Sequence, residues 1–60
     1  MNTHVRIAPY YSADRAAWVP CVVVEDPATG ELRGVVGQQD FGTYPEALEA
    51  SRYLALDLAR

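Results

Sequence analysis

The 60-residue chain has no lysine and only one cysteine, one histidine and one tryptophan. The single cysteine, Cys21, excludes an internal disulfide framework, and with His4 as the only other soft ligand a structural zinc site is not expected. No run approaches the roughly 18 apolar residues of a membrane span. The N-terminal residues also lack the apolar core and cleavage site of a signal peptide. We therefore expect a cytoplasmic protein whose lone thiol stays reduced.

Basic residues are also few: the chain has five of them and eight acidic residues, so the net charge is −3. Non-specific nucleic-acid binding draws its affinity from Lys and Arg contacts to phosphate, so this balance disfavours it. An acidic surface suits a basic protein partner instead. The absence of lysine beside nine alanines is typical of a GC-rich bacterium or its phage. The basic residues are all arginines: Arg6, Arg15, Arg33, Arg52 and Arg60.

The length predicts one small domain, residues 1–60, and 50% apolar with 22% charged residues is ordinary for a folded chain. A domain of this size buries only about 60% of the surface that its unfolded chain exposes. Its stability therefore depends on tight packing or on a partner.

Three β-like runs precede one helix. The first, residues 4–11, alternates in period two, and Pro9 places it at an edge or ends it there. The second, residues 17–25, is rich in β-branched residues and is apolar on both faces. The third, residues 31–41, contains two glycines that weaken it and allow strong twist.

The segment Asp-Pro-Ala-Thr-Gly at residues 26–30 predicts a hairpin loop, because Asp starts a turn, Pro presets φ and Gly accepts a positive φ. If this turn pairs Asp26 with Glu31, then Val22 lies opposite Val35.

A helix is predicted from Thr43 to the C-terminus. Thr43 and Glu46 have capping-box spacing, and Pro45 falls in the first turn, where its missing N–H costs little. The spacing of apolar and small residues predicts a face that packs on the sheet. That face carries Tyr44, Ala47, Leu48, Ser51, Leu54, Ala55, Leu58 and Ala59, and the opposite face carries Glu46, Glu49, Ala50, Tyr53, Asp57 and Arg60.

The predicted fold is α+β, a three-stranded antiparallel sheet with one C-terminal helix packed on one face (β-β-β-α). A single helix covers one side of such a sheet, yet the central strand is apolar on both sides. Covering the second side would be worth several kcal/mol at roughly 25 cal/mol per Å². The cover is a second copy, a foreign partner, or the folded-back N-terminal segment with Ile7, Tyr10 and Tyr11.

Little in the sequence indicates catalysis. Cys21 and His4 are distant in sequence, and neither Ser12 nor Ser51 stands in a nucleophile-elbow motif. No phosphate-binding loop or calcium loop is present, and the helix carboxylates are predicted to be solvated. We therefore expect no enzyme activity, no cofactor and no metal.

Two family resemblances involve the C-terminal half. The string from Trp18 through Asp26-Pro27-Ala28-Thr29-Gly30 to Phe41-Gly42-Thr43-Tyr44-Pro45-Glu46-Ala47 resembles the AP2-like arm-binding domains of tyrosine recombinases. This resemblance implies three strands, a helix and DNA reading by the sheet, with Trp18, Arg33 and Arg6 facing the DNA. The string Thr43-x-x-Glu46-Ala47-Leu48-x-x-Ser51 is similar to HicB-like antitoxins, which implies binding to a basic toxin.

The favoured interpretation is a small non-enzymatic module that binds a protein partner or itself through the sheet face not covered by the helix. The predicted partner-binding residues are Trp18, Val22, Val24, Arg33 and Val35. A register slip of one residue would move the prediction to Val19, Cys21, Val23 and Val36. The alternative is a DNA-binding sheet face, since Arg and Gln side chains can read base edges. Its candidate residues are Arg6, Trp18, Arg33 and Gln39, with Gln38 beside it.

Overall fold

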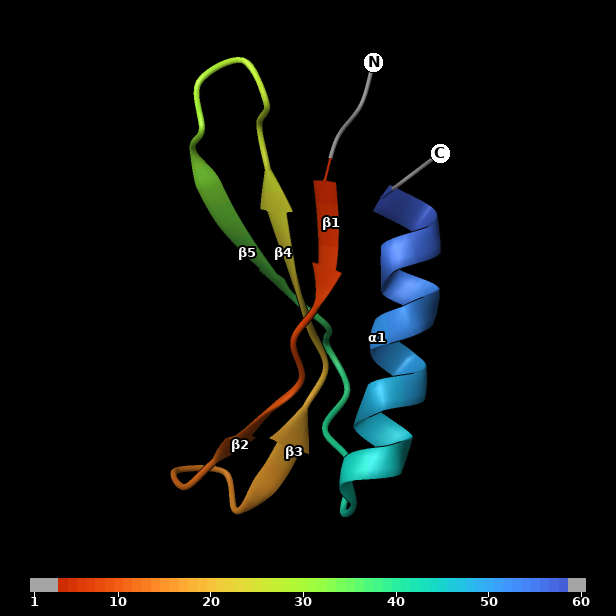
Figure 1. Cartoon of the computed structure of the whole chain (residues 1–60). Helices are drawn as coiled ribbons and strands as arrows, with labels where there is room; N and C mark the ends of the chain where they lie inside the picture. The colour runs from red at the N-terminus through yellow and green to blue at the C-terminus, as the bar shows by residue number, and fades with distance from the viewer. Residues whose placement is uncertain (1–3, 59–60) are drawn as a thin grey trace.

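The fold is α+β, as predicted, with a C-terminal helix against antiparallel strands (Figure 1). The computed structural model describes residues 4–58. The elements are β1 (His4–Ile7), β2 (Tyr10–Ser12), β3 (Ala17–Val19), β4 (Cys21–Glu25), β5 (Leu32–Val36) and α1 (Tyr44–Leu58). One sheet has the order β1-β4-β5, and a second pairs β2 with β3. The prediction of a single three-stranded sheet is therefore corrected to a three-stranded and a two-stranded sheet.

The division has a physical cause, which is a break at the same level in all three β-like runs. The register of β1 on β4 continues unchanged into that of β2 on β3, and it places Pro9 opposite Pro20. Pro9 stands at a non-bonded position, beside the bonded Ala8–Cys21 pair, whereas Pro20 belongs to a bonded pair with Gly37 and has no N–H to donate to it. On the other side of Pro20, the Gly37 N–H donates to the Pro20 carbonyl at 2.9 Å. The runs remain adjacent here, but each of the first two is split into two strands. The third run, predicted as a strand over residues 31–41, ends as a strand at Val36, and beyond it only Phe41 forms an isolated bridge to Trp18.

The hairpin between β4 and β5 has the predicted register. Val22 is paired with Val35 and Cys21 with Val36, and the Asp26 N–H donates to the Glu31 carbonyl at 2.9 Å. The Asp26 side chain accepts from the Ala28 N–H at 2.9 Å, which stabilises the loop. The loop glycine, Gly30, has φ 74°, as its position in the turn requires.

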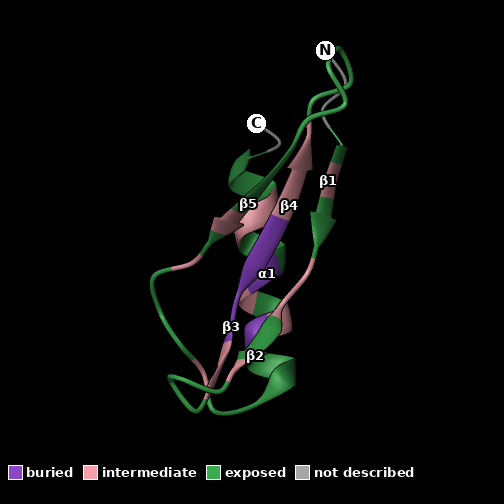
Figure 2. Cartoon of the chain, turned by 90° about the vertical axis from the view of Figure 1, so that its left-hand side faces the viewer, coloured by how far each residue is buried: buried purple, intermediate pink, exposed green. Residues whose placement is uncertain are grey.

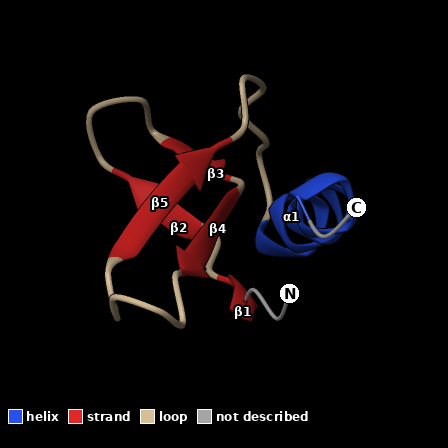
Figure 3. Ribbon diagram, turned by 90° about the horizontal axis from the view of Figure 1, so that it is seen from above, coloured by secondary structure: helices blue, strands red, loops and turns tan. Residues whose placement is uncertain are grey.

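Helix α1 begins directly after Thr43, as predicted. The Thr43 hydroxyl donates to the Glu46 carboxylate at 2.8 Å, so the two capping-box side chains bond to each other. The helix packs along β1 and β4 and, near its start, against β2 and β3 (Figures 1 and 3). Ala50 is half-buried, whereas the helical periodicity places it on the outward face. Ala59 and Arg60 lie outside the described residues.

The core lies between the helix and the strand segments on either side of Pro20 (Figure 2). Val19, Val22, Ala47 and Ser51 are completely buried there. The Ser51 hydroxyl donates to the Ala47 carbonyl at 2.7 Å and accepts from the Cys21 N–H at 3.1 Å. This serine thus satisfies a backbone donor at the point where the sheet is broken.

Aromatic and charged contacts connect β2 and β3 with the start of α1 and the segment before it. The Trp18 ring packs edge-to-face against Tyr11 and Tyr44, with ring centroids 5.5 and 5.2 Å apart. The Arg15 guanidinium forms an ion pair with Asp40 at 3.0 Å, which joins the β2–β3 turn to the segment before the helix. Since β1 and β2 pair beside the central strands, the N-terminal run is an edge of the sheets rather than a cover over their second side.

Candidate functional site

The side of the β1–β4–β5 sheet that faces away from α1 is the candidate site, and we call it the uncovered face. Successive strand residues point to opposite sides of a sheet. Val22, which is completely buried, therefore points toward the helix, whereas Val23 points away. The register places the following residues on the uncovered face: His4, Arg6, Cys21, Val23, Glu25, Leu32, Gly34 and Val36. Of these, Cys21 is buried, with 8% of its surface exposed.

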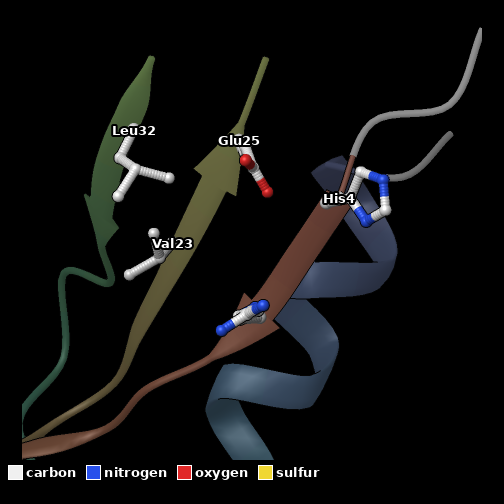
Figure 4. A pocket seen from close by; sticks show the side chains of 5 residues that line it. His4, Val23, Glu25 and Leu32 are labelled. Carbon is white, nitrogen blue, oxygen red and sulfur yellow. The ribbon is translucent and has the colours of Figure 1, made fainter. Parts of the chain in front are cut away.

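A shallow groove of about 200 Å³ crosses this face, between the strand side chains shown in Figure 4. Its walls are formed by His4 and Arg6 from β1, Val23 and Glu25 from β4, and Leu32 from β5. His4 is paired directly with Glu25, and Arg6 with Val23. The groove therefore has the basic Arg6 on β1, the acidic Glu25 on β4 and the apolar Leu32 on β5, a combination that suits a polypeptide.

The β5 side of the uncovered face is the most exposed apolar part of either sheet. Leu32 is 65% exposed and Val36 is 46% exposed. Helix α1 packs on β1 and β4, while β5 is the edge strand farthest from the helix (Figures 1 and 3). The two edges of the sheet thus differ, because the helix supports β1 and leaves β5 open.

The hydrogen bonds at the ends of the β4–β5 ladder show which backbone groups of β5 are free. Bonded and non-bonded pairs alternate along an antiparallel ladder. Both the Asp26–Glu31 pair and the Pro20–Gly37 pair are bonded. Because both of these pairs contain an odd-numbered residue of the third run, the odd-numbered residues of β5 are the ones whose backbone groups bond to β4. The N–H and C=O groups of Leu32, Gly34 and Val36 therefore point outward, and we call these groups the free edge.

The predicted partner-binding residues do not form one exposed surface. Val22 has no exposed area, because it lies beneath the helix, so its assignment to a binding surface is corrected to the core. Val24 and Val35 share its side of the sheet and are half-buried. Trp18 belongs to the aromatic cluster with Tyr11 and Tyr44 at the other end of the molecule.

The set predicted for a one-residue slip is divided as well. Val19 and Cys21 are buried, with 0% and 8% of their surface exposed, so neither belongs to an exposed binding surface. Val23 and Val36 lie on the uncovered face and remain candidates. Four further residues of this face were missed by sequence reasoning: His4, Glu25, Leu32 and Gly34. The alternation of β5 after the hairpin would have identified Leu32 and Gly34, since both lie on the same side as Val36.

The structure does not bring the DNA-binding candidates together. Arg6 is paired with Val23 and Arg33 with Val24, so the two guanidinium groups lie on opposite sides of the sheet. Arg33 shares a hollow of about 120 Å³ with Val24 and the acidic residues Asp26 and Glu31. Gln39 is exposed in the segment between β5 and α1, as is Gln38.

The thiol of Cys21 and the imidazole of His4 are also far apart. Cys21 is a buried free thiol at the start of β4, whereas His4 pairs with Glu25 at the other end of that strand. Four residues of strand separate their levels by about 13 Å. Within residues 4–58, no three potential metal-ligating side chains form a cluster, and no helix has the length and apolar character needed to cross a bilayer.

Comparisons with protein-family models, curated proteins and solved structures found no match to this chain. Neither family resemblance is therefore tested by a relative. The uncovered face and its free edge are surfaces that the fold leaves open.

Proposed function

We propose that this chain is a small non-enzymatic interaction module that binds polypeptide, either a partner protein or a second copy of itself, through the uncovered face. The observation that carries the proposal is the exposure of Leu32 and Val36 on a strand that the helix does not cover. Binding to another surface would remove these apolar side chains from water, which lowers the free energy.

The free edge supports the same function. An edge strand offers a row of unpaired backbone donors and acceptors, and many proteins recognise an extended segment by adding it as a further strand. Natural edges are often protected by proline or charged side chains. β5 contains no proline, and its one charged side chain, Arg33, lies on the side of the sheet opposite to Leu32 and Val36. The mixed charge of the neighbouring groove supplies polar contacts for the side chains of the added segment.

The DNA-binding alternative has less support. A surface that binds DNA gathers basic side chains on one side, whereas Arg6 and Arg33 lie on opposite sides of the sheet. The net charge of −3 also opposes binding to phosphate. Duplex binding that weakens steeply with salt and is lost in Arg6→Ala would favour DNA over polypeptide.

The proposal is tested with peptides selected for binding to the immobilised protein from a random library. Leu32→Asp and Leu56→Asp form a matched pair, because the two leucines are 65% and 63% exposed and Leu56 lies on the helix. We expect Leu32→Asp to weaken peptide binding at least tenfold and Leu56→Asp to leave it unchanged. Equal effects of the two substitutions, or no effect of Leu32→Asp, would contradict the proposal.

A further inference from the structure

The side chains at the free edge of β5 form a pattern that is complementary to itself. Leu32, Gly34 and Val36 carry the outward backbone groups, and their side chains share the uncovered face. When two copies of β5 lie antiparallel with their Gly34 residues opposite each other, Leu32 of each copy lies opposite Val36 of the other. A large apolar side chain therefore meets another on each side of the central glycine pair. A Cβ at Gly34 would meet no atom of its own chain within 4 Å, so the centre of the edge is open to a neighbour.

The ladder phase restricts the registers in which two such edges can pair. Only outward-pointing residues can exchange hydrogen bonds, so a two-fold axis at Gly34 pairs Gly34 with itself and Leu32 with Val36 of the second copy. An axis at Arg33 would place two guanidinium groups directly opposite each other, which is unfavourable. An axis at Val35 would pair Leu32 with Gln38, which lies beyond the end of β5.

The charges near the edge are compatible with the Gly34 axis. In this register Arg33 faces Val35 of the second copy, so no two like charges are directly opposite. Each Arg33 lies near Asp26 and Glu31 of its own chain, which balance its charge locally. A second copy therefore fits the edge without new charged partners.

We infer that two copies of this chain pair antiparallel through β5, about a two-fold axis at Gly34, to form a continuous six-stranded sheet. This inference rests on the proposed function and specifies the polypeptide that is bound. A stable interface buries about 800 Å² per partner, nearly a fifth of the accessible surface of 4507 Å². A contact made mainly by one five-residue strand is smaller, so we expect a weak, concentration-dependent dimer.

The first test is the mass of the protein from micromolar to millimolar concentration by sedimentation equilibrium. We expect the mass to rise from 6.6 kDa toward twice that value as the concentration increases. Gly34→Pro should abolish this rise, because it removes the outward N–H at the axis and leaves the bonds to β4 intact. Gly34→Ala, which keeps the N–H, should dimerise like the original chain.

Circular dichroism shows whether Gly34→Pro remains folded. If it unfolds, Leu32→Lys replaces it as the test variant and Leu56→Lys as its matched control, and only the first should reduce dimerisation. A dimer that persists in a folded Gly34→Pro, or that responds equally to the two lysine substitutions, overturns pairing through β5.

The register is tested by crosslinking. Bonded antiparallel pairs have Cα atoms about 5.5 Å apart, a distance that a disulfide can span. Under mild oxidation, Gly34→Cys should form a covalent dimer, whereas Leu32→Cys should not, since its own copy lies four residues away along the strand. Efficient crosslinking of Leu32→Cys without Gly34→Cys would overturn the Gly34 axis.

These outcomes separate the dimer from the wider proposal. A wild-type chain that stays at 6.6 kDa up to millimolar concentration overturns self-association. If the selected peptides still bind such a monomer and Leu32→Asp weakens them, the uncovered face remains a polypeptide-binding surface. If they do not, both proposals fail together.

Discussion

The two sides of β4 differ in what their valines do. Val22 points toward α1 and is completely buried, while its neighbour Val23 points to the uncovered face and lines a groove. Both stand in the same apolar run, and neither residue type nor strand propensity distinguishes them. Because only Val22 lies beneath the helix, we expect it to contribute more to stability than the valines of the uncovered face.

The strongest test of this difference compares the same substitution on the two sides. Val22→Ala should lower the free energy of unfolding by about 2–3 kcal/mol, because it leaves a cavity beneath the helix. Val36→Ala, at a position that is 46% exposed, should change it by less than about 0.5 kcal/mol. Urea unfolding at low protein concentration measures both. Equal losses would mean that the uncovered face contributes to the core.

A second comparison uses two glycines of the third β-like run. A Cβ at Gly37 would lie 2.7 Å from Cγ of the buried Pro20, whereas a Cβ at Gly34 would meet nothing within 4 Å. Gly37→Ala should therefore cost about 2 kcal/mol through overpacking at the break between the sheets. Gly34→Ala should cost less than about 0.5 kcal/mol. The measurement is the urea midpoint, and a tolerated Gly37→Ala would show that the break can relax.

Ser51 provides a test of the polar contact on the covered side. Ser51→Ala leaves the Cys21 N–H without its partner beneath the helix, so we expect a loss of about 1–2 kcal/mol. Ser12→Ala is the control, since the Ser12 hydroxyl accepts from the exposed Arg15 N–H at 3.3 Å, and it should cost about 0.5 kcal/mol or less. Thermal unfolding followed by circular dichroism distinguishes them. No difference between the two would mean that another group satisfies the Cys21 N–H.

The smallest expected effect concerns the loop that carries β5. Gly30 has φ 74°, a conformation that is unfavourable for alanine, so Gly30→Ala should lower stability by about 1 kcal/mol. Gly42, with no positive φ and open space around it, is the matched control and should tolerate alanine. Hydrogen exchange should show the loss as faster opening of the β4–β5 hairpin. Uniform protection in both variants would contradict this expectation.

The local features of the fold were predictable because each depends on neighbouring residues. The turn residues at 26–30 determine the loop, and the loop determines the pairing of Val22 with Val35. The spacing of Thr43 and Glu46 likewise predicted the start of the helix. The site was predicted less well, because period-two alternation identifies two faces of a strand without saying which one the helix covers.

By itself, the amino-acid sequence determined the element types, the hairpin register and the helix start, since turn chemistry, capping and periodicity act over a few residues. The tertiary structure decided which side of β4 is buried, that the runs break where Pro9 and Pro20 meet, and that the hydroxyl of Ser51 pairs with Cys21. It also decided that β5 is the open edge. These outcomes depend on where α1 packs after the chain has turned back, and this placement is a property of contacts between residues that are distant in sequence.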